Sequence, residues 1–274
     1  MNPLLDIRSL TTAFVNKNNI LTAVDDISFS LNKGETFAVV GESGSGKSIT
    51  ALSILRLVPA PGKIISGEIY FNDQHLLNLS EKQMRNIRGR HIGLILQDSG
   101  SALNPVMKVG EQIAEIYRHH FKFDRKKAFS ATVDLLAKVK LSNAESLYHA
   151  YPHQLSGGMR QRVLIAGAIA CKPALVIADE PTSALDASLQ SEILALLNDL
   201  KREMDLSLLL ISHDLAMVSQ IADRVAVMQN GKIVEQNTTE KLFTEPEHMY
   251  TKKLLNAIPK IEFGAVNSSA DKQL

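Results

Sequence analysis

The sequence is poor in cysteine, in excess charge of either sign and in long apolar runs. Cys171 alone closes no disulfide and cannot by itself hold a metal ion or an iron–sulfur cluster, so we expect a small buried side chain there. Thirty Lys and Arg against 29 Asp and Glu leave a formal net charge of +1, which gives no global attraction to nucleic acid or an anionic membrane. The longest uncharged apolar stretch, 163–171, has nine residues, whereas a membrane-spanning helix needs about 20. We expect any link to a membrane to run through a partner.

The chain has 274 residues, of which 45% are hydrophobic and 22% charged. This composition is typical of a globular protein with a sizeable core. The first ten residues lack both a basic segment and a long apolar one, so we expect no secretory signal and a cytoplasmic protein. The polar end of the chain, from about residue 265, cannot bury enough apolar surface to fold, and we expect disorder there.

Strand and helix patterns alternate along most of the chain. The expected strands are 4–10, 20–31, 36–40, 67–71, 91–98, 173–180, 206–212, 224–230 and 232–236. The expected helices are 48–58, 109–121, 124–141, 159–170, 188–204 and 214–222. Hairpin turns are expected at 16–19 and at Asn230-Gly231.

The segment 109–155 contains helical patterns and no strand candidate, which indicates an all-helical insert. Around it, continuous apolar runs such as LVIA and LLLI are typical of strands buried on both faces of a parallel sheet. The sequence therefore predicts an α/β fold with one domain, interrupted by a helical segment and followed by a short tail.

Residues 41–48, GESGSGKS, satisfy the phosphate-loop pattern G-x-x-x-x-G-K-[ST] between an expected strand and an expected helix. In this pattern, backbone amides of the glycine-rich turn and the helix N-terminus bind phosphate oxygens. Lys47 neutralises the β- and γ-phosphate charge, and the Ser48 hydroxyl can bind Mg²⁺. The candidate nucleotide-binding residues are Gly41, Glu42, Ser43, Gly44, Ser45, Gly46, Lys47 and Ser48.

Asp179 and Glu180 follow a buried strand, at the sheet edge where α/β proteins bind ligands. Alone, the pair is equally well explained as solvated turn residues. Beside a phosphate loop, Asp179 fits a Mg²⁺ ligand and Glu180 fits a carboxylate that orients water against the γ-phosphate.

Residues 155–159, LSGGM, open another expected helix. Ser156 suits an N-cap, and Gly157 and Gly158 permit close approach of the backbone. The segment is either a second anion site or a plain helix cap, and its letters alone leave both interpretations open.

Together these segments resemble the ATP-binding subunit of an ABC transporter over residues 5–259. The motifs that match, in order, are Walker A (41–48), the Q-loop glutamine (Gln97), the signature (155–162), Walker B (175–180), the D-loop (183–186) and the switch histidine (His213). The resemblance implies a P-loop NTPase (RecA-like) core with a mixed or parallel sheet and an N-terminal antiparallel β-subdomain. It implies an ATPase domain over 1–240 with the helical subdomain inserted at about 98–158, and a C-terminal extension over 241–274.

The resemblance also implies ATP and Mg²⁺ as ligands, with Ile49 added to the phosphate-loop residues. Gln97 would contact Mg²⁺ or the attacking water, and His213 would hold the γ-phosphate. Glu180 and Lys47 would be the other catalytic residues. Two such domains would pair head to tail, so that 156–158 complete the site of the opposite subunit and Asp186 communicates across the dimer.

Phe14 stands where the family carries an aromatic residue that stacks on adenine. A phenylalanine of the structural core is the competing interpretation, and the sequence leaves both open.

Within the family, residues 97–105, 151–162 and 247–259 resemble the peptide and nickel importer branch, although Met249 stands where that branch usually has proline. The resemblance implies two permease subunits, an extracytoplasmic substrate-binding protein and a sister or identical ATPase subunit, with no nucleic acid. The chain would lie at the cytoplasmic face of the inner membrane. The alternatives are a soluble ABC ATPase that remodels ribosome or DNA complexes, and a regulatory module that binds ATP without hydrolysing it.

Overall fold

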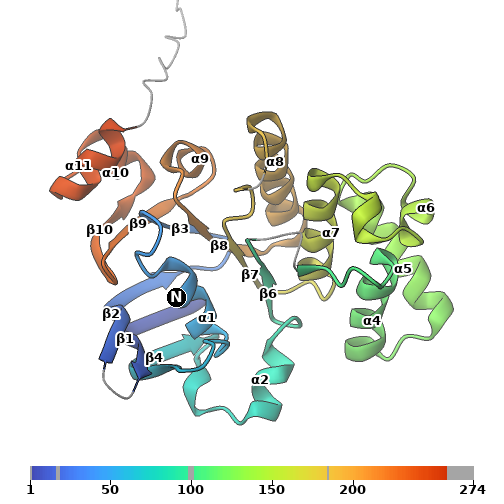
Figure 1. The fold of residues 1–274 in the computed structure, drawn as a ribbon, viewed down its shortest axis with the longest axis horizontal. Helices are drawn as coiled ribbons and strands as arrows, with labels where there is room; N and C mark the ends of the chain where they lie inside the picture. The colour runs from blue at the N-terminus through green and yellow to red at the C-terminus, as the bar shows by residue number, and fades with distance from the viewer. Residues whose placement is uncertain (1, 17–18, 98–101, 184, 258–274) are drawn as a thin grey trace, which may run out of the picture.

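The computed structural model, drawn in Figure 1, describes residues 2–16, 19–97, 102–183 and 185–257. One of its two sheets is antiparallel, with strand order β2-β1-β4-β5. Its strands are β1 (Leu5–Asn16), β2 (Asn19–Leu31), β4 (Gly62–Phe71) and β5 (Gln74–His75). This sheet is the predicted N-terminal antiparallel β-subdomain. Strands β1 and β2 pair as far as Asn16 and Asn19, while the two residues between them lie outside the described part of the chain.

The second sheet is mixed, with strand order β10-β9-β3-β8-β7-β6. Its strands are β3 (Thr36–Val40), β6 (Ile92–Ile95), β7 (Leu175–Asp179), β8 (Ser207–Ser212), β9 (Arg224–Gln229) and β10 (Lys232–Thr238). All neighbours are parallel except β9 and β10. Every residue of β3, β7 and β8 is buried, as their apolar runs predict. Asn230 and Gly231 both have positive φ, 48° and 83°, and form the predicted hairpin turn between β9 and β10.

The two faces of the mixed sheet belong to two separate hydrophobic cores. In β3, Phe37 and Val39 face the core shared with the antiparallel sheet and α1 (Lys47–Ile54), whereas Ala38 and Val40 face the other core. Helices α7 (Gly157–Ile169) and α8 (Ala187–Met204) pack in that other core. Because successive side chains of a strand point to opposite faces, alternate residues of β3 pack in different cores.

Helices α4 (Val109–Phe121), α5 (Arg125–Lys138) and α6 (Ala144–Tyr148), with the short turn Pro152–Gln154, fill the predicted helical insert. Figure 1 shows them grouped on the side of the molecule opposite the antiparallel sheet. Val109 and Ile113 of α4 join the core formed with α7 and α8. No strand interrupts 109–155, as predicted. Among the residues that the structure describes, no helix is long and apolar enough to cross a membrane.

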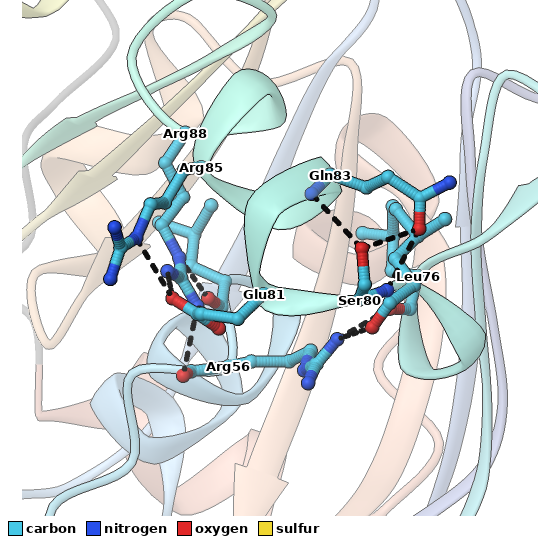
Figure 2. Close-up of polar contacts among 9 residues, drawn as sticks. Arg56, Leu76, Ser80, Glu81, Gln83, Arg85 and Arg88 are labelled. Atoms are coloured by element: carbon cyan, nitrogen blue, oxygen red, sulfur yellow. Dashed lines mark hydrogen bonds and ion pairs between the residues drawn. The ribbon is translucent and has the colours of Figure 1, made fainter.

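Helix α2 (Glu81–Ile87), which the sequence analysis missed, is fixed against the end of α1 by the polar contacts in Figure 2. Ser80 and Gln83 form a reciprocal capping box at its N-terminus. The Arg88 guanidinium donates to Glu81 at 2.6 Å and to the Leu55 carbonyl at 2.8 Å. The S-x-x-Q spacing of residues 80–83 is the signal that could have predicted this helix.

Helix α1 was expected to reach Val58, but it ends at Ile54. The cause lies two residues later, where Arg56 adopts the left-handed conformation with φ of 53°, which no helix continues through. Its guanidinium donates to the carbonyls of Leu76 and Leu79, the latter at 2.6 Å. Helix α9 (Leu215–Ser219) likewise ends before the expected residue 222.

The C-terminal helices α10 (Thr239–Thr244) and α11 (Met249–Asn256) were also not predicted. They lie beside β10 in Figure 1. Leu242 and Tyr250 are buried in the core formed with α7 and α8. Through residue 257 the C-terminal segment therefore packs on the core of the mixed sheet, while 258–274, including the expected disordered end, lie outside the described residues.

Candidate functional site

Four neighbouring strands of the mixed sheet deliver the candidate residues to one edge. Strand β3 ends before the phosphate loop, β8 before His213, β7 at Asp179 and β6 two residues before Gln97. These strands are parallel neighbours, so their carboxyl ends meet. A cavity of about 520 Å³ lies there. Its lining residues are Ala23, Gly41, Glu42, Ser43, Gly44, Gly46, Lys47, Ser48, Ile49, Gln97, Glu180, His213 and Leu254.

The phosphate loop is held in a tightly packed backbone conformation. Gly46 has φ of 107°, and a Cβ there would clash with the Ala23 carbonyl oxygen, so only glycine fits. Lys47 is 4% exposed, and its Nζ donates to the carbonyls of Gly41 (2.8 Å) and Glu42 (2.9 Å) across the loop. Burial lowers the pKa of Lys47, while the nearby Glu180 and Asp179 charges oppose that shift.

Ser48 and Asp179 bring two oxygen donors together at the start of α1. The Ser48 hydroxyl donates to Asp179 Oδ1 at 3.0 Å, and Asp179 is 6% exposed. Burial raises the pKa of Asp179, and the Glu180 charge adds to the rise, whereas the Ser48 hydrogen bond and Lys47 oppose it. A cation at this position would favour the charged carboxylate.

Glu180 is the centre of a second cluster that faces the cavity. Gln97 Nε2 donates to Glu180 Oε2 at 2.9 Å, and His213 Nδ1 lies 3.2 Å from the same oxygen. Glu180 has φ of 46°, and its N–H donates to the Ile211 carbonyl at 2.9 Å. Left-handed backbone at a non-glycine residue is costly and concentrates at functional sites. In Glu180 this backbone conformation follows the end of β7, and the carboxylate lies between Gln97 and His213.

The donor set fits a magnesium nucleotide. The buried Lys47 cation and the amides at the start of α1 suit phosphate oxygens. Ser45 Oγ is buried without a hydrogen-bond partner among the described residues, which leaves another polar group within the loop. The Ser48 hydroxyl and Asp179 carboxylate are the hard oxygen ligands that Mg²⁺ prefers.

The signature residues and Asp186 lie outside this cavity in the single chain. Ser156 caps α7 by accepting from the Met159 N–H at 3.3 Å, and Asp186 caps α8 in the same way. Gly157 faces Leu185: a Cβ there would come within 3.4 Å of the leucine side chain. Within one chain, Ser156 therefore acts as a helix cap. That it also completes the nucleotide site of a second subunit stays a prediction. Ala184 of the predicted D-loop lies outside the described residues.

Phe14 is half-buried in β1 and does not line the cavity. Its partner across the sheet is Leu21 of β2, the strand that continues to the lining residue Ala23. Its ring lies beside Gly62, where an added Cβ would come within 2.9 Å of a ring carbon. Stacking of Phe14 on adenine therefore stays a prediction.

If Phe14 stacks on adenine, Phe14→Ala will weaken ATP and ADP binding alike, by about 1–3 kcal/mol when base stacking in nucleic-acid proteins is the guide. Equilibrium titration with both nucleotides measures the change. Phe129→Ala, which truncates another half-buried phenylalanine in α5, is the control for general loosening. A large fall in the unfolding temperature with unchanged affinity would instead assign Phe14 to the structure.

Sequence reasoning missed Ala23 and Leu254 of the cavity lining and Tyr250 next to it. The Tyr250 hydroxyl accepts a hydrogen bond from the Glu42 N–H at 3.1 Å. Glu42 and Tyr250 are 208 residues apart, and no local pattern signals a contact over that distance.

Comparison with known proteins shows which families the sequence matches. Residues 24–183 match the family described as "ABC transporter", and residues 234–272 match "Oligopeptide/dipeptide transporter, C-terminal region". The oligopeptide transport ATP-binding protein AppD of Bacillus subtilis is 48% identical over 96% of this chain and 80% of its own length. The dipeptide transport ATP-binding protein DppD of the same organism is 45% identical over 96% of this chain and 78% of its own.

Solved structures with the same fold include ATP-binding cassettes. A dimeric cassette, MJ0796, in a post-hydrolysis state bound to ADP and phosphate aligns with a TM-score of 0.77 and 25% identity, over 86% of this chain and 98% of its own. The protein cbiO1 of Clostridium perfringens, part of the transporter complex cbiONQ, aligns with a TM-score of 0.76 and 26% identity, over 89% and 92% of the two chains.

Proposed function

The chain belongs to the ABC transporter family as an ATP-binding subunit, and from that premise we propose that it hydrolyses ATP to energise the import of peptides through a membrane permease. The observation that carries the proposal is the meeting of Lys47, the Ser48–Asp179 pair and Glu180 at one cavity. The match of residues 234–272 to the oligopeptide/dipeptide C-terminal region supports peptides as the substrate class. The curated relatives do not favour a ribosome- or DNA-remodelling ATPase.

In the proposed mechanism, the phosphate loop binds the nucleotide and Glu180 acts on the attacking water. Lys47 neutralises charge on the β- and γ-phosphates. Glu180, fixed by Gln97 at 2.9 Å and His213 at 3.2 Å, orients the water and accepts its proton. His213, with its side chain 57% exposed, is free to turn toward the γ-phosphate once nucleotide is present.

Ser48 and Asp179 would hold a Mg²⁺ ion. Gln97, which lines the same cavity as Ser48, would contact that ion or the attacking water. When bound, that ion neutralises phosphate charge in phosphoryl transfer. The protein's own part is to keep the hydroxyl and the carboxylate 3.0 Å apart at the start of α1.

We propose that two ATPase subunits pair head to tail, with Ser156, Gly157 and Gly158 of one completing the γ-phosphate site of the other. These residues lie at the N-terminus of α7, which favours anions, yet outside the chain's own cavity. A dimeric solved relative bound to ADP and phosphate supports this assembly. Asp186, at the N-terminus of α8, would contact the partner beside the signature.

Ser156→Arg is expected to leave nucleotide binding at the same chain's Lys47 unchanged and to lower hydrolysis at the partner's site. The arginine would place a bulky side chain where the partner's γ-phosphate binds. Mixing the variant with a wild-type partner and measuring nucleotide trapping at each site tests this. Ser80→Arg is the matched control, because it also removes a serine N-cap but lies on α2. Loss of binding at the variant's own site would contradict the head-to-tail arrangement.

The remaining partners follow from the proposed transport. Two permease chains would dock near Gln97 and the helical subdomain, which places this chain at the cytoplasmic face of the membrane, and an extracytoplasmic binding protein would deliver substrate to the permease. Co-purification from native membranes with mass spectrometry tests the partners, and uptake assays with peptides and nickel test the cargo. ATP turnover that depends on peptide would support the proposal. ATP turnover that stays the same with and without the permease would contradict it.

A further inference from the structure

We propose that α11 is part of the nucleotide site: Tyr250 holds the phosphate loop at Glu42, and Leu254 with Ala23 forms the wall that takes the adenosine part of ATP. The inference rests on the proposed ATP site and adds contacts from the C-terminal segment to it. It makes Tyr250 a positioning residue and Leu254 a binding residue.

The Tyr250 contact comes from a buried side chain that reaches the loop itself. Tyr250 is 7% exposed and packs in the core, and its hydroxyl oxygen accepts from the Glu42 N–H at 3.1 Å. Burial raises the pKa of Tyr250, so the hydroxyl stays neutral at physiological pH. The bond fixes the loop one residue after Gly41, on the backbone whose carbonyls also bind Lys47.

The start of α11 is itself tied to the mixed sheet, so Tyr250 is a rigid support. Both carboxylate oxygens of Glu235 in β10 accept backbone N–H groups, from Glu247 at 2.8 Å and from His248 at 3.0 Å. His248 Nδ1 in turn accepts from the Tyr250 N–H at 3.2 Å. Burial opposes ionisation of Glu235, but these backbone hydrogen bonds outweigh it and lower the pKa of the carboxyl group.

The apolar lining of the cavity indicates where the base lies. Outside the loop segment 41–49, the polar lining residues are Gln97, Glu180 and His213, and the apolar ones are Ala23 and Leu254. Phosphates occupy the loop beside Lys47, so the base and ribose extend toward the remaining apolar surface. Leu254 lies one turn after Tyr250 on α11, which puts both contacts on one face of the helix.

The test compares ATP, ADP and inorganic tripolyphosphate binding to the full chain, since tripolyphosphate lacks the adenosine. Tyr250→Phe keeps the ring and removes the hydroxyl, so the affinities for all three ligands are expected to fall about two- to tenfold, the range of one hydrogen bond. In the assembled ATPase, the KM for ATP rises by the same factor with kcat unchanged. Leu254→Ala is expected to weaken ATP and ADP about tenfold and to leave tripolyphosphate unchanged.

Two matched variants separate these effects from loosened packing. Tyr148→Phe removes another buried tyrosine hydroxyl, which donates to Glu111 in the helical subdomain. Leu255→Ala truncates the neighbouring leucine of α11, which packs on the core and does not line the cavity. Affinities and unfolding temperatures are measured for all four variants.

If wild-type chain binds ATP and Tyr250→Phe and Leu254→Ala bind it as well as their controls do, the inference is overturned and the proposed function stands. Equal loss in each variant and its control would also overturn it. Wild-type chain that binds no ATP would refute the proposed function and this inference together.

Discussion

Glu180→Gln is expected to lower ATP turnover by about 10²- to 10⁴-fold, the usual contribution of a positioned general base, while ATP affinity stays close to wild type. Glutamine keeps the shape of the side chain and an oxygen that can accept from Gln97, but it cannot take a proton from water. The phosphate contacts of Lys47 and the loop amides are untouched. Phosphate release and equilibrium ATP binding by the paired subunits measure the two quantities.

Glu111→Gln is the matched control for this prediction. Glu111 is half-buried like Glu180 and also meets two side chains, Tyr148 at 2.7 Å and Arg118 at 3.2 Å. It lies in α4, outside the cavity lining, so turnover by this variant should match wild type. Near wild-type turnover by Glu180→Gln would remove Glu180 from the mechanism.

Lys47→Ala is expected to raise the dissociation constant for ATP about 10- to 150-fold. The substitution deletes a charge-assisted hydrogen-bond donor to phosphate, worth about 1.5–3 kcal/mol. The same side chain bonds the Gly41 and Glu42 carbonyls at 2.8 and 2.9 Å, so its loss also loosens the loop. ATP titration of the isolated chain measures the effect.

Lys201→Ala separates the charge effect from a general loss of stability. Lys201 is another lysine with a largely buried side chain and two side-chain acceptors, Thr36 at 2.8 Å and Asp223 at 3.1 Å. It does not line the cavity. ATP affinity that is unchanged in Lys47→Ala, or equally reduced in Lys201→Ala, would exclude phosphate binding as the role of Lys47.

The sequence predicts the parts of this molecule that depend on short, contiguous sequence patterns. The phosphate loop is a strand, a glycine-rich turn and a helix start within 36–54, and the Asn230-Gly231 turn has two residues suited to positive φ. The apolar runs LVIA and LLLI predict the buried strands β7 and β8.

What the sequence does not predict depends on contacts between residues far apart in the chain. The early end of α1 comes from the left-handed Arg56, whose guanidinium donates to carbonyls 20 and 23 residues away. The Gln97–Glu180 hydrogen bond joins residues 83 apart. The Tyr250 contact to the phosphate loop joins residues 208 apart, from a short helix that the sequence analysis did not predict.

The central claim is that this chain converts ATP hydrolysis into peptide import, and one measurement tests it most directly. The chain is co-purified with its permease, reconstituted into vesicles with the peptide-binding protein, and phosphate release is followed with and without peptide. The account predicts release that rises with peptide and vanishes when every ATPase subunit carries its Glu180→Gln-type substitution. Phosphate release that does not change with peptide, or that continues in the substituted complex, would contradict the account.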